Sequence, residues 1–256
     1  MEPWLVLRVF KFIGVALFAG GVMLSTSPRS QRERLVAAWG LLPLGFVFTW
    51  LAGYGLLKST GVSMGAPWVS ASMLLSLAAL HLGMLGARTP QRQAWRGLAA
   101  RACLGASIGA MVGRGAGAEW AMTAALGAAV AGTVAWALAR GMPTPAADPA
   151  PDADALVLEG FWRWSRLEAL SAIALFLVYL PAKYGAGVVL DGGAGWFGWV
   201  HGVLIFVFVN GLGAAARAGG WSAATTALGF AAAMVPGGGL WFEHRMRRAA
   251  EARAAA

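Results

Sequence analysis

The sequence has 256 residues, of which 59% are hydrophobic and only 12% are charged, and its formal net charge is +9. A soluble domain carries about 25% charged residues, so this composition is that of a chain dissolved in lipid, and it excludes disorder and collagen-like repeats. A single cysteine excludes a disulfide scaffold.

Long apolar segments follow one another along the chain. A helix needs about 20 mostly apolar residues to cross a hydrocarbon core about 30 Å thick. The candidate segments are residues 4–25, 35–57, 68–85, the shorter 97–112, 120–138, 167–180 with its extension 161–166, 196–214 and 221–242. Because lipid offers no partner to backbone polar groups, these segments must be helical. We therefore expect an all-α polytopic transmembrane protein with seven to eight membrane helices in two small bundles.

Basic residues gather in short segments between the apolar ones, mainly at 26–34, 86–101 and 245–253. Arginine and lysine stay on the cytoplasmic side of a membrane, which explains the positive charge without a nucleic-acid partner. This distribution predicts a multi-pass protein of the bacterial cell inner (plasma) membrane, with its amino terminus outside. Eight full crossings would put the basic carboxyl terminus outside as well. The alternatives are that 97–112 does not cross fully, or that the last segment bends back at Pro236–Gly239.

A segment rich in proline and aspartate divides the chain. Residues 141–158 have no apolar periodicity, which is typical of an extended connector outside the lipid. We expect an amino-terminal membrane unit of four to five helices at 1–140, a linker at 141–158, a three-helix membrane domain at 159–248 and a polar tail at 249–256.

Several short motifs occur in order in the carboxy-terminal third: RLEALS at 166–171, PAKY at 181–184, WVHG at 199–202, WS at 221–222, Pro236, and FEHR at 242–245. With these motifs the segment from about 160 to 248 resembles a bacterial integral-membrane family known as domain of unknown function 3817. The resemblance implies a three-helix membrane domain and no particular activity. The run Gly237-Gly238-Gly239 after the proline departs from the family's usual form.

The amino-terminal half carries FKFIG at 10–14, AGG at 19–21 and GYGLL at 53–57. In these stretches it is similar to four-helix membrane domains of the copper-resistance and haem-binding type. Those families place a histidine about where Lys11 stands, so the resemblance implies a packing pattern without the haem or metal ligand.

Polar residues inside predicted spans cost free energy and are candidates for function. The candidate polar positions are Glu168, Lys183, His201, Asn210 and Glu243. Glu168 is either a proton or cation contact or an interfacial ion pair with the neighbouring Arg163 or Arg166. If the helices alternate in direction, Lys183 and His201 meet on one face while Glu168 and Glu243 lie elsewhere.

Gly105, Gly109 and Gly113 fall four residues apart and form a small-residue helix face. Such a face lets two helix backbones approach closely, within one chain or between copies. The sequence has no catalytic motif, no metal-ligand spacing and no cofactor motif. We therefore expect no catalytic residue, no metal and no cofactor.

Three functions remain open from the sequence. The first is a structural or partner-binding membrane component that contacts the lipid bilayer and a second copy or another membrane protein. The second is a small-solute or proton-coupled transporter with Glu168, Lys183 and His201 on its path. The third is a haem or quinone redox membrane protein.

Overall fold

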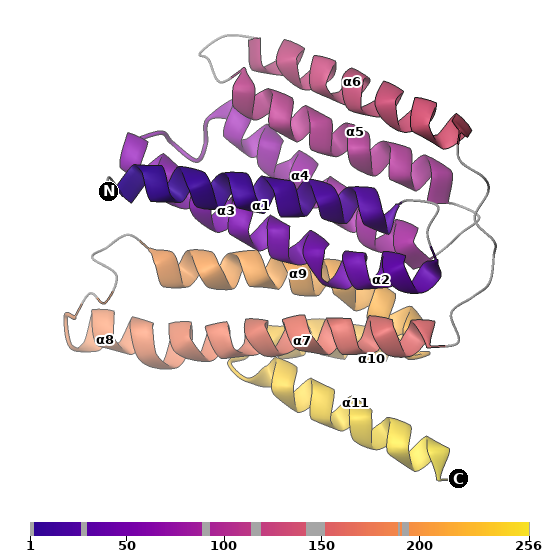
Figure 1. Ribbon diagram of the computed structural model, residues 1–256. Helices are drawn as coiled ribbons and strands as arrows, with labels where there is room; N and C mark the ends of the chain where they lie inside the picture. The colour runs from indigo at the N-terminus through magenta and orange to yellow at the C-terminus, as the bar shows by residue number, and fades with distance from the viewer. Residues whose placement is uncertain are drawn as a thin grey trace. The chain divides into compact units, whose positions relative to one another are not determined.

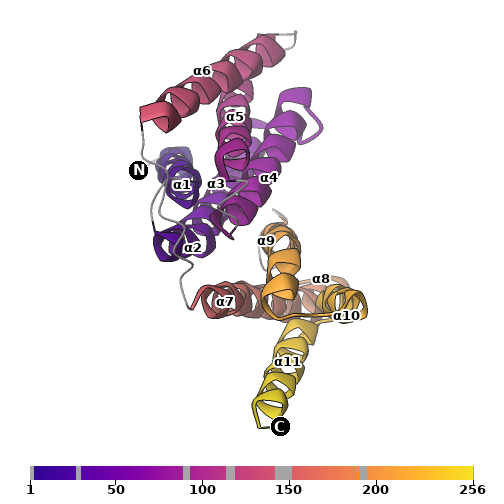
Figure 2. The same cartoon turned by 90° about the vertical axis from the view of Figure 1, so that its right-hand side faces the viewer.

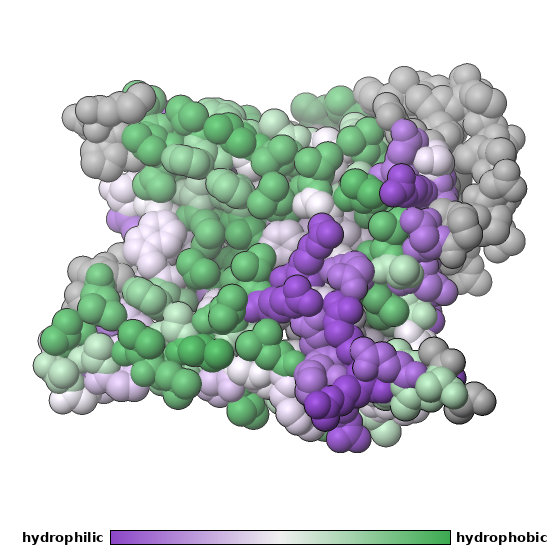
Figure 3. Space-filling view, turned by 60° about the horizontal axis from the view of Figure 1, so that its bottom comes forward, coloured by the Kyte–Doolittle hydropathy of each residue, from purple (hydrophilic) through white to green (hydrophobic). Residues whose placement is uncertain are grey.

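The computed structural model describes residues 3–26, 30–88, 93–113, 119–141, 152–188, 190 and 195–255. Within these ranges the regular elements are helices and no strand occurs (Figure 1), so the predicted all-α class is confirmed. Five of the described helices are long and apolar enough to cross a membrane: Leu5–Ser25, Gln31–Thr60, Pro67–Arg88, Ala153–Gly185 and Trp196–Ala218. The predicted count of seven to eight is not confirmed by these criteria. On the face shown in Figure 3, hydrophobic side chains cover much of the surface.

The chain divides into two compact units, Met1–Leu156 and Val157–Ala256. The helices of the first unit are α1 (Pro3–Ser25), α2 (Gln31–Trp39), α3 (Leu41–Thr60), α4 (Pro67–Arg88), α5 (Gln93–Val112) and α6 (Glu119–Gly141). Ser30 begins α2 with a capping box, because its side chain accepts from the Glu33 N–H and the Glu33 carboxylate accepts from the Ser30 N–H. The span predicted at 35–57 is therefore two helices that meet at Gly40.

Small and aromatic residues hold α1, α3 and α4 together. The backbone of Gly45 lies so close to Phe18 that a Cβ at position 45 would overlap it. The Phe18 and Phe46 rings are 5.8 Å apart, and the Trp50 indole N–H donates to Ser76 Oγ at 3.0 Å. The two buried polar groups named here, the Trp50 indole and the Ser76 hydroxyl, therefore satisfy each other.

The helices α5 and α6 lie side by side (Figures 1 and 2), and the glycines of the small-residue face of α5 meet α6 of the same chain. A Cβ on Gly105 would overlap the Gly127 carbonyl, and one on Gly109 would overlap the Thr123 carbonyl. Gly113 meets the Thr123 side chain in the same way. The sequence left open whether the partner of this face is internal, and here it is α6.

The second unit contains α7 (Ala153–Ile173), whose first turn lies in the first unit. The chain continues without interruption through a π-helical segment (Ala174–Tyr179) into α8 (Leu180–Gly185), followed by α9 (Trp196–Ala218), α10 (Ala223–Ala233) and α11 (Gly238–Ala254). An aromatic core joins α7, α9 and α11: Phe161 lies 5.1 Å from Phe208, and Trp162 lies 6.1 Å from Phe242, between ring centroids.

The helix α7 begins earlier than predicted. The proposed linker covers 141–158, of which 142–151 lie outside the described residues, but α7 already starts at Ala153. In the sequence the last proline before this helix is Pro151, and Asp154 in the first turn is favourable at a helix amino terminus. At the other end, residues 249–254 of the predicted polar tail form the last part of α11.

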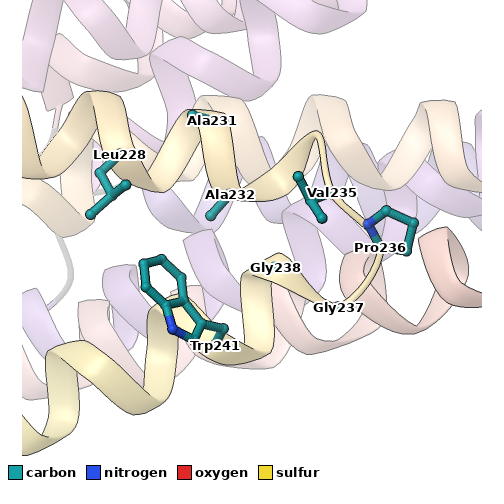
Figure 4. Close-up of a pocket in the computed structure, with 8 residues that line it drawn as sticks. All are labelled: Leu228, Ala231, Ala232, Val235, Pro236, Gly237, Gly238 and Trp241. Atoms are coloured by element: carbon teal, nitrogen blue, oxygen red, sulfur yellow. The ribbon is translucent and has the colours of Figure 1, made fainter.

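The span predicted at 221–242 is not one helix, which corrects the expectation of a simple three-helix domain. Ser222 caps α10, whose 11 residues end at Ala233, and α11 begins at Gly238. Pro236 has no N–H to continue a helix, and Gly237 adopts a φ of 78° that an L side chain rarely takes. The chain turns back at this point and α11 returns beside α10 (Figure 4), as in one of the two alternatives left open by the sequence.

Candidate functional site

Glu168 lies in the middle of the long α7–α8 helix and is completely buried, with 0% of its surface exposed. The sequence placed it near the start of a span, because the apolar run begins around residue 161. The helix starts at Ala153, so more than three helical turns precede Glu168 and bring it into the interior of the second unit. A carboxylate at this depth is expensive unless it is neutralised or paired.

The imidazole of His201 faces this carboxylate from α9. His201 Nδ1 lies 3.8 Å from Glu168 Oε1 and 3.2 Å from Ser171 Oγ. Ser171 Oγ donates to the Glu168 backbone carbonyl at 2.6 Å, so its only proton is already in use. The Ser171 hydroxyl therefore accepts from His201 Nδ1, which must carry a proton and presents that N–H between the hydroxyl and the carboxylate.

Neither carboxylate oxygen of Glu168 has a hydrogen-bond partner in the described part of the chain, and neither does Ser165 Oγ. Both side chains lie against Gly239 at the start of α11. A Cβ at position 239 would lie 3.1 Å from Ser165 Oγ and 3.3 Å from Glu168 Oε2. The absence of a side chain on Gly239 therefore leaves the room that this carboxylate occupies.

The π-helical segment contacts the His201 side of the pair through Phe176. The Phe176 ring meets the His201 ring edge-on, with centroids 5.8 Å apart. Further along, Tyr179 stacks on Phe197 at 4.7 Å. π-Helical turns occur frequently at functional sites, and this one begins three residues after Ser171.

An ion-pair network lies beyond the buried pair, between α7 and α11. Arg166 Nε donates to Glu243 Oε2 at 2.8 Å, Arg247 Nε donates to Glu243 Oε1 at 2.8 Å, and Arg247 also reaches Glu159 at 2.9 Å. Burial opposes ionisation of Glu243, but the hydrogen bonds and charges of Arg166 and Arg247 outweigh it and hold the pKa of this carboxyl below its usual range. Desolvation opposes the charge on Arg247, but its hydrogen bonds to Glu243 and Glu159 outweigh it and hold the pKa of this guanidinium above its usual value.

The predicted pairings therefore change. Arg166, which was a candidate partner for Glu168, binds Glu243 instead, because the returning α11 carries Glu243 alongside it. The expected contact between Lys183 and His201 is wrong, since His201 meets Glu168. Lys183 Nζ lies over the rings of Tyr179 and Tyr184, at 5.6 Å and 5.2 Å from their centroids.

The remaining candidate, Asn210, donates to the Phe206 carbonyl of its own helix at 2.7 Å. Sequence reasoning missed Ser165, Ser171, Glu159 and Arg247 as members of these two groups. A usable signal existed for Ser171, because it stands three residues after Glu168 and therefore on the same helix face. Among the residues that the structure describes, no group of three or more His, Cys, Asp or Glu side chains is arranged to hold a metal ion.

The fold and this site define an all-helical chain with five described helices long and apolar enough to cross a membrane, and with a carboxylate and an imidazole facing each other inside its second unit. Residues 158–248 match the family described as Domain of unknown function (DUF3817), in agreement with the resemblance seen in the motifs. The matched segment contains Glu168, Ser171, His201 and Glu243. No curated protein and no solved structure matches the chain.

Proposed function

We propose that this chain is a multi-pass protein of the bacterial inner membrane whose second unit binds and releases a proton at the Glu168–His201 pair, in the service of a proton-coupled process such as the movement of a small solute. The observation that carries the proposal is a fully buried carboxylate without a hydrogen-bond partner, 3.8 Å from an imidazole. Ionisable groups inside membrane segments typically mark ion or proton pathways.

This arrangement supports proton binding over a purely structural role. A charged side chain at the centre of a span costs about 2.5–3.5 kcal/mol on insertion scales. An apolar residue at position 168 would fill the same space without that cost, so a purely structural role does not explain a glutamate there. Because His201 Nδ1 already carries a proton, the pair can hold one further proton in two places: on the Glu168 carboxyl, which leaves both groups neutral, or on His201 Nε2, which makes an ion pair.

Infrared spectroscopy on the full-length protein in lipid tests the proposal directly. A protonated carboxyl has its own C=O stretching band, and wild-type protein should show one such band, from a buried group, that disappears as pH rises. Glu168→Gln should lack this band, and His201→Phe should shift the pH at which it titrates. Glu251→Gln, which changes an exposed carboxylate on α11, is the matched control and should leave the band unaltered. A buried-acid band that persists in Glu168→Gln would overturn the proposal.

We also infer seven crossings, made by α1, α2–α3, α4, α5, α6, α7–α8 and α9, with α10 and α11 as a hairpin that enters the membrane and returns. The 11 residues of α10 extend about 16 Å, half of the hydrocarbon thickness. The returning α11 then passes Glu168 at Gly239, Arg166 at Glu243 and Glu159 at Arg247. Both ends of the hairpin thus lie on the side where α7 begins, and its arginines fall on the cytoplasmic side.

Reporter fusions test this topology. A fluorescent protein fused after residue 255 should be fluorescent, and alkaline phosphatase fused there should be inactive. The same two reporters fused after Gly61, in the loop between α3 and α4, should give the opposite result. Active phosphatase at the carboxyl terminus would contradict seven crossings.

A further inference from the structure

An open groove of about 460 Å³ lies between α10 and α11 of the hairpin (Figure 4), and neither Glu168 nor His201 lines it. Leu228 and Val235 line it from α10, Pro236 from the turn and Trp241 from α11. The groove has no charged side chain in its lining, and its only side-chain polar atom is the indole nitrogen of Trp241. Ligand pockets typically have volumes of about 300–1,000 Å³ and mostly apolar walls.

The shape of the hairpin creates this groove. At the turn the two helices are in backbone contact, because a Cβ on Gly238 would overlap the Ala232 carbonyl. One turn further along α11, the Trp241 indole extends toward α10, and Leu228 points toward it from the other helix (Figure 4). Val235 and Trp241 remain 58% and 49% exposed, so hydrocarbon from the bilayer has access to the space between them.

The Trp241 end of the groove is followed along α11 by two arginines on the same side of the helix. The Arg245 guanidinium lies 5.6 Å from the centroid of the Trp241 ring. Arg248 follows seven residues after Trp241 and therefore on the same side of α11. Both arginines are exposed, and neither has a carboxylate partner in the described part of the chain. Arg247, on the adjacent face, differs because Glu243 and Glu159 neutralise it.

An apolar groove followed by two arginines without carboxylate partners suits a molecule that has a hydrocarbon chain and an anionic headgroup. We propose that the groove binds one acyl chain of an anionic phospholipid from the bilayer, with the lipid phosphate held by Arg245 and Arg248. The partner is recognised by both parts: the wall between Leu228 and Trp241 takes hydrocarbon, and guanidinium groups suit phosphate oxygens. Clusters of arginine on amphipathic helices beside a membrane are typical of anionic-lipid binding. This proposal does not depend on proton binding at Glu168.

Native mass spectrometry of the full-length protein released from nanodiscs tests the proposal. The nanodiscs contain phosphatidylglycerol and phosphatidylcholine with matched acyl chains, and the ratio of the two lipids retained by the protein is measured. Wild-type protein should retain phosphatidylglycerol preferentially. Arg245→Gln should reduce that preference about fivefold, the equivalent of the roughly 1 kcal/mol that one basic residue contributes near an anionic surface.

Arg253→Gln is the matched control, because it removes the same charge from the exposed end of α11, away from the groove. It should leave the preference at the wild-type value. Equal preference in Arg245→Gln and Arg253→Gln would overturn the proposal, and circular dichroism on both variants shows that any difference does not come from misfolding.

A second variant separates the acyl chain from the headgroup. Val235→Trp fills the groove and should reduce retention of both lipids at this site. Glycerol 3-phosphate, which has the headgroup charge without the chain, should not displace phosphatidylglycerol from wild-type protein. Displacement by glycerol 3-phosphate would assign a headgroup site alone and would contradict the acyl-chain part of the proposal.

Discussion

The helices of the two units pack through different kinds of residues. In the first unit, glycines on α5 bring its backbone against α6, and Ser72 and Ser107 satisfy each other across α4 and α5 at 3.0 Å. In the second unit, α7, α9 and α11 meet through aromatic rings, an ion-pair network and the buried Glu168. The close backbone contact of α5 and α6 needs no charged side chain, so helix packing alone does not explain the fully buried carboxylate of Glu168.

The largest effect is expected from adding a side chain at the close backbone contact between α5 and α6 in the first unit. Gly109→Ile would force the isoleucine into the Thr123 carbonyl and Ala124, and α5 and α6 would have to separate. We expect this change to lower the free energy of unfolding by on the order of 3 kcal/mol. Thermal unfolding in detergent, followed by circular dichroism, measures the effect.

Gly53→Ile is the matched control, because a Cβ at Gly53 meets nothing within 4 Å. It should leave the unfolding midpoint nearly unchanged. If both variants melt together with wild type, the contact between α5 and α6 does not stabilise the first unit.

A second, smaller effect is expected from the ion-pair network of the second unit. Glu243→Gln removes the carboxylate that Arg166 and Arg247 share. Hydrogen bonds to charged groups contribute about 1.5–3 kcal/mol, and the partial exposure of both arginines favours the lower end. We expect a loss of about 1.5 kcal/mol in unfolding free energy at neutral pH, measured against Glu251→Gln as the control.

The same network predicts a pH dependence with a defined sign. The pKa of Glu243 is below its usual range in the folded chain, so its contribution to stability is complete above the unfolded value of about 4.3. That contribution is lost as pH falls through the folded pKa. The stability difference between wild type and Glu243→Gln should therefore be constant near neutral pH and shrink below about pH 4.3. A difference that grows on acidification would contradict the assignment.

The smallest effect is expected at Gly239, where the second unit has room for a carboxylate. Gly239→Ala places a methyl group 3.3 Å from Glu168 Oε2 and 3.1 Å from Ser165 Oγ. These contacts are tight enough to displace the side chains but not the helices, so we expect a stability change of less than about 1 kcal/mol. The infrared band assigned to Glu168 should nevertheless shift in frequency. Gly202→Ala, which meets nothing within 4 Å, should leave that band in place.

Much of the architecture was predictable from local pattern. Apolar segments of bilayer length require helices whatever their neighbours, and the small-residue spacing on α5 is a local pattern that favours close helix contact. The break near Pro236 was foreseen as one of two alternatives, because proline and glycine interrupt a helix by their own covalent structure. The start of α7 was placed too late, since the amino-terminal turns of that helix carry Asp154, Glu159 and Arg163 and do not look like part of an apolar span.

The site was predictable only in its members. The sequence alone selected Glu168, His201 and Glu243, because an ionisable side chain within or beside an apolar segment can be recognised without knowing how the helices pack. Their partners were decided by the tertiary structure: the early start of α7 sets the depth of Glu168, α9 brings His201 to it, and the return of α11 gives Arg166 to Glu243. The physical reason is that composition and hydropathy act residue by residue, whereas the pairing of charges depends on how far one helix is shifted along another.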